Sequence, residues 1–449
     1  MVQYIGMNIY ISGISGTGLG PLALMAKDAG LSVSGSDANE GAIASELMRK
    51  NISVRFGEQD GIFLQEMYDA GKVDWFVYTS ALPADHPELV LAKKLGLRVS
   101  KRDELIAYLV DKLGLKMVAV AGTHGKTTTT AMITWTALNL GLPVSYLVGT
   151  TLPFAEAGCY DTKSSFLIYE ADEYDKNFLH FFPWLSVITT VSYDHPDIYP
   201  TRLDYMRAFS KFEGQSENVI RGAELEGSAV SQNTETIDLS DKFSLAGQAR
   251  RYDASLAMQA VFEMVEEIDM EVASGNLISG GKSYAGRKID EELLIEILND
   301  FPGVGRRFER IHENVYSDYG HHPEEIAATL EVAKEEAKRL GLSGVVAVYE
   351  PHQNVRQHEI FEGYKDAFIG ADKLFWLPTY LVREDPALKV ITPAEFIASL
   401  SNSSIGEPAE MNDDLAEKLR DFQKQGYLVL LMTAGPADTW LRKVFDEKE

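Results

Sequence analysis

Residues 115–128, LKMVAVAGTHGKTT, decide the fold of this chain. The apolar run from Leu115 to Ala121 is typical of a buried strand, and the segment from Thr128 to Leu140 has the pattern of a helix. A strand, a glycine-bearing turn, the pair Lys-Thr and a helix together form a cradle for phosphate, because backbone N–H groups and the helix N-terminus face the anion. The stretch therefore predicts a site for a nucleoside triphosphate.

The residues of this turn have separate tasks in the predicted cradle. Lys126 brings a positive charge to the phosphates, and the Thr127 hydroxyl can hold Mg²⁺. The strict phosphate-loop pattern has a further glycine five residues before Gly125, where this chain has Val120. The strand and the helix on either side still favour the phosphate site over an ordinary turn.

Length and charge exclude several classes of protein. The chain has 449 residues, which suggests about three domains at roughly 150 residues each. Its 67 acidic and 42 basic side chains give a net charge of −25, so we expect neither nucleic acid nor a membrane as a partner. The single cysteine, Cys159, excludes an internal disulfide framework and fits a cytoplasmic location. The uncharged stretches 1–26 and 127–155 contain glycine or proline breaks, so we expect neither a signal peptide nor a membrane span.

A second glycine-rich turn lies near the start of the chain. It is predicted to join a strand to a helix and a second strand, in the order Asn8 to Ser12, Gly13 to Gly18, Pro21 to Ala29 and Leu31 to Ser34. Such a unit binds a nucleotide pyrophosphate at the N-terminus of its helix. The glycines follow G-x-x-G-x-G rather than G-x-G-x-x-G, so support for a hydride-transfer cofactor is weak.

Two further groups in this domain stand where ligands usually bind. Asp37 follows the second strand and either accepts a hydrogen bond from a ribose hydroxyl or caps a turn. A later strand at 75–78 leads into the polar loop Thr79-Ser80-Ala81. Ligands of open α/β sheets bind at such carboxyl ends of strands, so we expect this loop at the site.

Carboxylates and a histidine follow the strands predicted after the phosphate loop. Glu170-Ala171-Asp172-Glu173 comes after a strand at 166–169 and either reaches a metal bound to the triphosphate or forms a solvated acidic loop. His195 comes after a strand at 187–191 and is either a turn histidine or a ligand. Its place after a parallel strand, in a chain with a triphosphate loop, favours the ligand. The polar stretch from 213 to about 242 predicts loops or short strands.

The third part of the chain, which begins near residue 301, again alternates strands and helices. Asp318 and the pair His321-His322 precede a helix that is predicted to start at Pro323. Strands are predicted at 345–349, 373–376 and 428–432. The loops after the first two of these strands carry Arg356 and Arg383, which either capture a carboxylate or phosphate or are ordinary surface arginines.

These patterns predict an α/β protein of three domains. We expect a Rossmann-like N-terminal domain at 1–110, which would bind a UDP-sugar. A central P-loop ATPase domain with a mostly parallel sheet is expected at 111–300. A Rossmann-like C-terminal domain, at 301–449, would bind an amino acid. The ligands of the outer two domains follow from a family resemblance that the motifs carry as a set.

Taken in order, the motifs resemble those of the Mur ligases, the ATP-dependent amide-forming enzymes of peptidoglycan synthesis. The stretches that carry the resemblance are Gly13 to Gly18, Gly122-Thr123-His124-Gly125-Lys126-Thr127, Glu170-Ala171-Asp172-Glu173, Asp194-His195, Arg306-Arg307-Phe308, Asp318 to Pro323, Pro351-His352 with Arg356, and Tyr380 with Arg383-Glu384. The likeness spans most of the chain and fades between about 213 and 300. Agreement of so many motifs in one order is far more specific than any single motif.

Two branches of the family are similar to different parts of the chain. The third domain, with Pro351-His352 and Tyr380-x-x-Arg383-Glu384, resembles the branch that adds L-alanine to UDP-N-acetylmuramate. The stretches 170–175 (EADEYD) and 36–39 (SDAN) look more like the branch that adds a murein tripeptide during recycling. In this family the third domain selects the incoming amine, so we give its motifs more weight and expect L-alanine.

The resemblance implies ATP and Mg²⁺ as cofactors and a cytoplasmic monomer or homodimer. It implies that the catalytic residues are Lys126, Glu170 and His195, and that Mg²⁺ is held by Thr127, Glu170 and His195. The implied ATP-binding residues are Gly122, Thr123, His124, Gly125, Lys126, Thr127, Thr128, Arg306, Arg307 and Asp318. Those implied for the UDP-substrate are Gly13, Ser15, Gly16, Thr17, Gly18, Ser36, Asp37, Ser80, Ala81 and Arg102. Those implied for the amino acid are His321, His352, Arg356 and Arg383.

Some positions depart from the family pattern. Family members usually position adenine with a His-Asn pair and a second Asn, but the matching stretch here has Ala249, Arg250 and Asp253. Ser15 replaces a family glycine, and Thr190 stands where Asn is common. A degenerate relative that binds nucleotides without ligase activity therefore stays open as an alternative.

Overall fold

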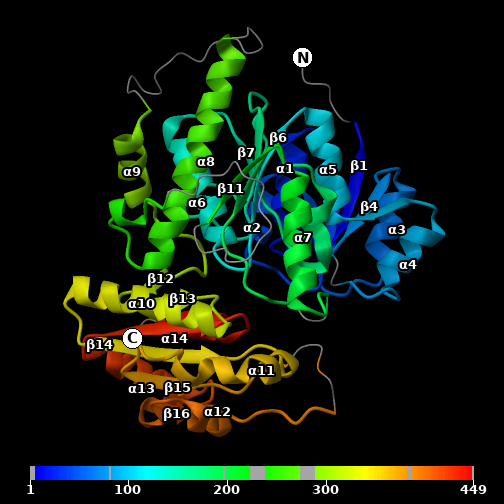
Figure 1. The fold of residues 1–449 in the computed structure, drawn as a ribbon. Helices are drawn as coiled ribbons and strands as arrows, with labels where there is room; N and C mark the ends of the chain where they lie inside the picture. Colours follow the sequence, from blue (N-terminus) through cyan, green and yellow to red (C-terminus); the bar gives the residue numbers. More distant parts are fainter. Residues whose placement is uncertain are drawn as a thin grey trace. The chain divides into compact units, whose positions relative to one another are not determined.

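The computed structural model describes residues 6–79, 82–195, 198–222, 238–273, 289–381, 384 and 387–446. Three sheets, each covered by helices, build the chain (Figure 1). The chain divides into two compact units, one of residues 1–243 and 252–302 and the other of residues 244–251 and 303–449. Among the described residues, no helix has both the length and the apolar character that crossing a bilayer requires.

The N-terminal sheet is parallel throughout, with the strand order β3-β2-β1-β4-β5. Its strands are β1 (Asn8–Ser12), β2 (Ser32–Asp37), β3 (Ser53–Phe56), β4 (Trp75–Tyr78) and β5 (Arg98–Lys101). Its helices are α1 (Gly20–Asp28), α2 (Ala44–Arg49), α3 (Ile62–Asp69), α4 (Pro87–Lys94) and α5 (Arg102–Leu113). The order reverses between β1 and β4, and open α/β sheets bind their ligands at such a point.

The central sheet has the order β11-β10-β6-β9-β7-β8, and only the short pair β7–β8 is antiparallel among its described strands. Its strands are β6 (Lys116–Ala121), β7 (Ser145–Leu147), β8 (Gly158–Cys159), β9 (Phe166–Glu170), β10 (Leu185–Ile188) and β11 (Asn218–Arg221). The helices of this part of the chain are α6 (Lys126–Leu140), η1 (Tyr174–His180), α7 (Arg202–Gly214), η2 (Ser240–Lys242), α8 (Gln248–Ala273) and α9 (Glu291–Asn299). Part of the polar stretch at 213–242 thus forms β11, and residues 223–237 lie outside the described residues.

The N-terminal and central sheets share one hydrophobic core. Buried side chains of β1 and α1 belong to the same cluster as those of β6 and β9. Helix α1 approaches β8 so closely that a Cβ on Gly158 would collide with the carbonyl group of Pro21. An ion pair from Lys50 to Glu156, 2.8 Å long, adds a polar contact between the two parts. The two sheets therefore form a single packed unit.

The C-terminal sheet has the order β12-β13-β17-β14-β15-β16, with β12 antiparallel to β13 and the other pairs parallel. Its strands are β12 (Glu309–His312), β13 (Val315–Asp318), β14 (Gly344–Glu350), β15 (Lys373–Trp376), β16 (Gly406–Pro408) and β17 (Tyr427–Thr433). Its helices are α10 (Pro323–Leu340), α11 (Asn354–Ile360), η3 (Phe361–Asp366), α12 (Pro393–Ser399), η4 (Ser403–Ile405), α13 (Asp413–Lys424) and α14 (Ala437–Asp446). Helices α10 and α13 cover opposite faces of this sheet (Figure 1), so it has a separate core on each face. The predicted fold class, α/β with three mostly parallel sheets, is confirmed.

Candidate active site

The phosphate loop joins β6 to α6 and needs both of its glycines. Gly122 has φ 143° and Gly125 has φ 81°, conformations that residues with a Cβ rarely adopt. A Cβ on Gly122 would collide with the Thr189 hydroxyl, and one on Gly125 would lie 2.5 Å from Asp253 Oδ1. Gly125 is also the N-cap of α6, where no side chain among the described residues caps the helix. The first N–H groups of α6 can therefore bind an anion.

The loop is held in place by the segment that follows β10. The backbone N–H of Thr123 donates to the carbonyl of Thr190 at 2.8 Å, and the N–H of His124 donates to the Thr190 hydroxyl at 2.9 Å. The Thr123 hydroxyl donates to the carbonyl of Ser192 at 2.7 Å. Thr190, one of the departures from the family pattern, thus supports the loop through both its backbone and its side chain.

Lys126 lies inside the loop with its ammonium group surrounded by acceptors. It donates to the carbonyl oxygens of Gly122 and Thr123 and pairs with Glu173 Oε2 at 2.9 Å. Burial alone would lower the pKa of this ammonium, but the carboxylates of Glu173, Asp172 and Glu170 raise its pKa above the usual value. Lys126 therefore keeps its charge at neutral pH.

Glu173 belongs to the acidic stretch that the sequence marked, but it was not among the individual residues predicted for the site. Its side chain is 2 % exposed and lies between Lys126 and His195, whose Nε2 is 3.7 Å from Glu173 Oε1. Burial would raise the pKa of this carboxyl group, but Lys126 and His195 hold it below the usual value. A hint was available in its spacing, three residues after Glu170 at the end of a strand next to β6.

The predicted metal ligands come from three neighbouring strands, β9, β6 and β10, whose carboxyl ends lie at one edge of the sheet. The Thr127 hydroxyl donates to Glu170 Oε1 at 2.8 Å, and Glu170 Oε2 accepts from the N–H of Gly149 at 3.2 Å. His195 has a φ of 57° and reaches this group through Glu173. The Thr127 hydroxyl and the Glu170 carboxylate are oxygen ligands of the kind that Mg²⁺ prefers, so these two groups fit that ion, whereas the His195 imidazole offers a nitrogen.

A cavity of about 440 Å³ lies at the carboxyl edge of the N-terminal sheet. Six of the residues predicted for the UDP-substrate line it, namely Gly13, Gly16, Thr17, Gly18, Asp37 and Arg102. Ser80 and Ala81 lie outside the described residues, but their neighbours Thr79 and Leu82 also line the cavity.

Ser15, Ser36 and Asp37 hold the glycine turn of this cavity together. The N–H of Ser15 donates to Asp37 Oδ2 at 2.9 Å, and the Ser15 hydroxyl donates to the carbonyl of Asn39 at 2.8 Å. The carbonyl of Ser36 accepts from the N–H of Gly13 at 2.8 Å. Asp37 therefore closes the turn and lines the cavity as well, while Ser15 and Ser36 support it.

The acidic segment 170–177 forms a wall that the cavity shares with the phosphate loop. Asp172 and Asn177 line the cavity, whereas Glu170 and Glu173 contact the phosphate loop. Arg102 Nη2 lies 3.6 Å from Asp172 Oδ2. One segment thus both lines the cavity and contacts the phosphate loop.

In the second unit, Arg306, Arg307 and Asp318 gather at the carboxyl ends of β13 and β17. The two guanidinium groups lie over the ring of Tyr319, at 4.8 and 5.2 Å from its centre. Arg306 also donates to the carbonyl of Thr433 at 2.6 Å. Asp318 is buried, which raises its pKa, and its carboxylate accepts from the N–H groups of Phe308 and Gly320, both at 2.7 Å. Asp318 therefore fixes the loops that carry the arginines.

Three of the residues predicted for the amino acid also lie together in the second unit. Arg356 Nη1 lies 2.6 Å from His321 Nε2, and the centre of the His352 ring is 6.1 Å from that of the His321 ring. Burial, together with nearby Arg356, lowers the pKa of His321 to about 4, so the imidazole is neutral and accepts from Arg356. Arg383 lies outside the described residues, but its neighbour Glu384 accepts from the N–H of Asn354 at 3.0 Å.

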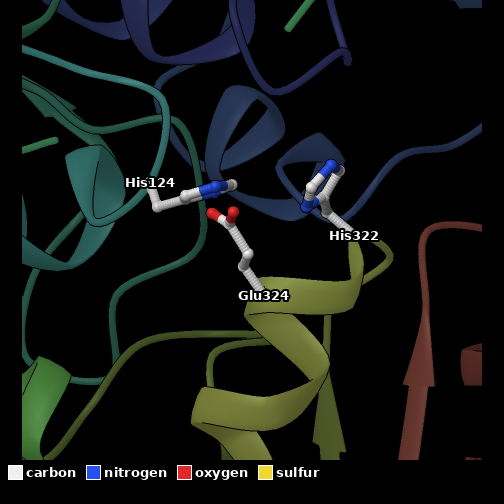
Figure 2. Close-up of side chains that lie close together, drawn as sticks. All are labelled: His124, His322 and Glu324. Atoms are coloured by element: carbon white, nitrogen blue, oxygen red, sulfur yellow. The ribbon is translucent and has the colours of Figure 1, made fainter. Parts of the chain in front are cut away.

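The loop before α10 brings His321 to this cluster. The carboxylate of Glu325 accepts from the N–H groups of His321 and His322, at 3.0 and 3.2 Å. Figure 2 shows His322 directly before the first turn of α10 and Glu324 within that turn. The predicted helix start at Pro323 is confirmed, and it fixes the backbone of both histidines.

Comparison with known proteins identifies the family. Residues 8–112 match the description "Mur ligase family, catalytic domain", and residues 120–264 match "Mur ligase middle domain". A UDP-N-acetylmuramate–L-alanine ligase from Clostridium tetani is 30% identical, with 97% of this chain and 96% of the relative covered. The enzyme of that name from Clostridium acetobutylicum is 31% identical over 85% of this chain and 84% of its own length.

This chain belongs to the Mur ligase family. A solved UDP-N-acetylmuramate–alanine ligase from Thermotoga maritima has the same fold, with a TM-score of 0.73, 23% identity and 98% of each chain covered. The resemblance that the motifs carried is thereby confirmed. The individual site residues and the domain limits at 110 and 300 stay predictions.

The stretch 249–253, where the sequence departs from the family pattern expected for adenine, has a structural role in this Mur ligase. Residues 248–253 form the start of α8, and Asp253, where the family has Asn, is 7 % exposed. Its carboxylate stands directly against Gly125 of the phosphate loop. The sequence marked Asp253 only as a departure, because its contact with the loop joins residues more than a hundred positions apart.

Proposed function

We propose that this Mur ligase joins the amine of L-alanine to the carboxylate of UDP-N-acetylmuramate and uses ATP to drive the reaction. The observation that carries the proposal is the wall at 170–177, which borders the phosphate loop on one side and the cavity of the N-terminal sheet on the other. An acid bound in that cavity can meet the terminal phosphate of a nucleotide bound at the loop. The names of the relatives support the choice of both substrates.

The proposed chemistry has two steps. An oxygen of the substrate carboxylate attacks the γ-phosphorus, the bond from that phosphorus to ADP breaks, and an acyl phosphate forms. The amine nitrogen of L-alanine then attacks the acyl carbon, inorganic phosphate leaves, and the nitrogen loses a proton. Activation is needed because a carboxylate is a poor electrophile and its oxide is a poor leaving group. Such phosphoryl transfer asks mainly for positioning and charge neutralisation.

The residues of the phosphate loop meet these demands. Lys126, kept charged by its carboxylate neighbours, would neutralise the β- and γ-phosphate oxygens. Thr127, Glu170 and His195 would hold Mg²⁺, whose charge offsets that of the phosphates. The N-terminus of α6 would bind the phosphates through its N–H groups.

The C-terminal cluster is proposed to bind L-alanine. Arg356 is a donor fork suited to the carboxylate of an amino acid, and neutral His321 adds no competing positive charge beside it. His352 and Arg383 complete the proposed set. Arg306, Arg307 and Asp318 are proposed to serve the nucleotide. A cytoplasmic monomer or homodimer stays the expected state.

An amino-acid panel tests the proposal. The purified chain is mixed with ATP, Mg²⁺ and UDP-N-acetylmuramate, and ADP release is measured with L-alanine, glycine, L-serine or the tripeptide L-Ala-γ-D-Glu-diaminopimelate. We expect release that depends on L-alanine and a product heavier by one alanine residue. Release with the tripeptide alone would move the chain to the recycling branch, which the stretch 170–175 resembles. If no amine caused ADP release, the chain would be a nucleotide-binding relative without ligase activity.

A variant links this activity to the loop. Lys126→Ala should abolish ADP release, because the phosphate charge is no longer neutralised. The melting temperature of the variant, measured alongside, shows whether it is folded. Full turnover by a folded Lys126→Ala protein would contradict the proposed role of the loop.

A further inference from the structure

A buried carboxylate without a basic partner among its described contacts lies beneath the cavity of the N-terminal sheet. Glu88, in the first turn of α4, is 1 % exposed. Three hydroxyl groups donate to it, those of Tyr10 and Ser12 at 2.6 Å and that of Ser36 at 2.7 Å. A buried charge needs such donors, and the N-terminus of α4 adds a favourable dipole.

The side-chain amide of Gln59 completes this network from the cavity side. Its Nε2 lies 2.9 Å from Ser36 Oγ and 3.3 Å from both Ser12 Oγ and Glu88 Oε2. Gln59 itself lines the cavity. The network therefore connects a buried charge to a residue that a ligand can touch.

The network fixes the orientation of the Gln59 side-chain amide, that is, whether Nε2 or Oε1 faces Glu88. The two serine hydroxyls give their hydrogens to Glu88, so only their lone pairs face Gln59. A carboxylate also only accepts hydrogen bonds. If the amide were turned over, its oxygen would face three acceptors, whereas the NH₂ group can donate its two hydrogens toward them. The atom left for a ligand in the cavity is therefore Oε1, an acceptor.

The sheet order indicates which part of a nucleotide reaches Gln59. A pyrophosphate binds at the glycine turn after β1, and a ribose binds near the end of β2, where Asp37 lies. Gln59 follows β3, the next strand beyond β2. The base, which is attached to the ribose on the side away from the pyrophosphate, extends toward β3.

We propose that Gln59 selects a uracil base by accepting the hydrogen bond of its N3–H group, and that Glu88 acts through Gln59 as a positioning residue. The inference rests on the proposed function only in that the ligand is a uridine nucleotide. Uracil carries a donor at N3, whereas cytosine carries an acceptor there, which would face Oε1 with an unfavourable contact. A base that is methylated at N3 lacks the donor and adds bulk.

Calorimetric titration with three diphosphates tests this selection. The probes are UDP, CDP and 3-methyluridine 5′-diphosphate. We expect the wild-type protein to bind UDP at least about tenfold more tightly than either of the others, the range that one well-placed hydrogen bond can give. Wild-type protein that binds UDP and its N3-methyl form equally well would overturn the inference while leaving the proposed function standing. Failure to bind UDP at all would overturn both.

Variants distinguish a loss of base selection from a general loss of nucleotide affinity. Gln59→Leu should weaken UDP binding about tenfold and bring the ratio of CDP to UDP dissociation constants close to one. Glu88→Gln offers the amide of Gln59 both a donor and an acceptor, so this ratio should fall there too, in protein shown by its melting curve to be folded. Equal weakening of all three nucleotides by Gln59→Leu, with the ratio unchanged, would overturn the inference. Gln65→Leu is the matched control, since that amide binds Asp69 on the surface of α3 and should change nothing.

Discussion

At the scale of single residues, a buried ion pair between Lys126 and Glu173 sets the charge balance of the phosphate loop. Both side chains are largely buried, at 15 and 2 % exposure. A buried ion pair contributes little net stability, yet removal of one partner leaves an uncompensated charge. Phosphate groups at the loop would give Lys126 other anionic partners. The stability effect of losing Glu173 should therefore depend on the nucleotide.

Glu173→Gln is predicted to lower stability by about 3 kcal/mol, because the Lys126 ammonium stays buried without its anion. Thermal melting should show the largest loss without ligand and a smaller one with saturating ATP and Mg²⁺, whose phosphates pair with Lys126. Glu58→Gln, a change at an exposed position after β3, is the control and should leave the melting temperature unchanged. A loss that is the same with and without ATP would show that Lys126 does not meet the phosphates.

His321 gives a prediction for pH. Burial and Arg356 lower its pKa to about 4 in the folded chain, from the ordinary 6.5 of an unfolded one. At pH values between the two pKa values, the unfolded chain therefore binds more protons than the folded chain. The stability that the neutral imidazole contributes is fully present above pH 6.5 and is lost as the pH falls toward 4. The shift corresponds to about 3 kcal/mol. Denaturant unfolding from pH 7 to 4 should show this loss, and His321→Gln should flatten it. If His321→Gln left the dependence of stability on pH unchanged, the lowered pKa of His321 would not be its cause. His312→Gln, a change at an exposed position, is the control and should keep that dependence.

At the scale of elements, the two ends of α6 offer a matched comparison. Gly125 at its start and Gly141 at its end both have positive φ, 81° and 73°. A Cβ at Gly141 meets no atom within 4 Å, whereas one at Gly125 would lie 2.5 Å from Asp253 Oδ1. The backbone strain of an alanine is thus similar at both ends. The start of α6 differs from its end in having a steric conflict with Asp253 and a proposed nucleotide site.

Gly141→Ala is predicted to cost about 1–2 kcal/mol from the left-handed conformation alone. Gly125→Ala should cost more, because Asp253 must move, and should also weaken ATP binding at least about tenfold since the loop can no longer close around the phosphates. Thermal melting and ATP titration of the two variants, side by side, check this. Equal ATP affinity in both variants would show that the loop does not bind the nucleotide.

The elements also show where prediction from the sequence works. The strands Asn8–Ser12, Trp75–Tyr78 and Lys373–Trp376 were predicted with their observed bounds, because each is a short run rich in aromatic and branched aliphatic side chains. The strands β3, β5, β12 and β16 were not predicted. Each has a charged residue or a proline and little apolar sequence, and its pairing comes from a neighbouring strand.

The same distinction applies to the candidate site. Lys126, Thr127 and Glu170 could be predicted, because a local motif or the end of a strand marks each of them. The sequence marked Glu173 only as part of an acidic stretch and did not mark Gln59, since their roles depend on partners far away in the sequence, Lys126 for the first and Glu88 for the second. A local pattern carries no information about such partners until the fold brings them together.

At the scale of the whole molecule, the shared core of the first unit couples the two proposed nucleotide sites. The N-terminal and central sheets belong to one cluster of buried side chains. The wall at 170–177 touches the cavity with Asp172 and the phosphate loop with Glu173. Elements that share a core unfold together, so a ligand at either site should stabilise both sheets.

Calorimetric melting with separate ligands tests this cooperativity. We predict that UDP and ATP with Mg²⁺ each raise the temperature of the same transition, because both sites belong to one unfolding unit. Each ligand should add RT ln(1 + [L]/Kd) to the free energy of unfolding of that unit. Lys50 binds Asp28 at 2.6 Å and Glu156 at 2.8 Å, so Lys50→Met should lower that transition, while Lys112→Met, on an exposed side chain, should not. If UDP raised one transition and ATP another, the two sheets would be independent domains. The wall at 170–177 would then not fix the position of an acid in the cavity relative to a phosphate at the loop.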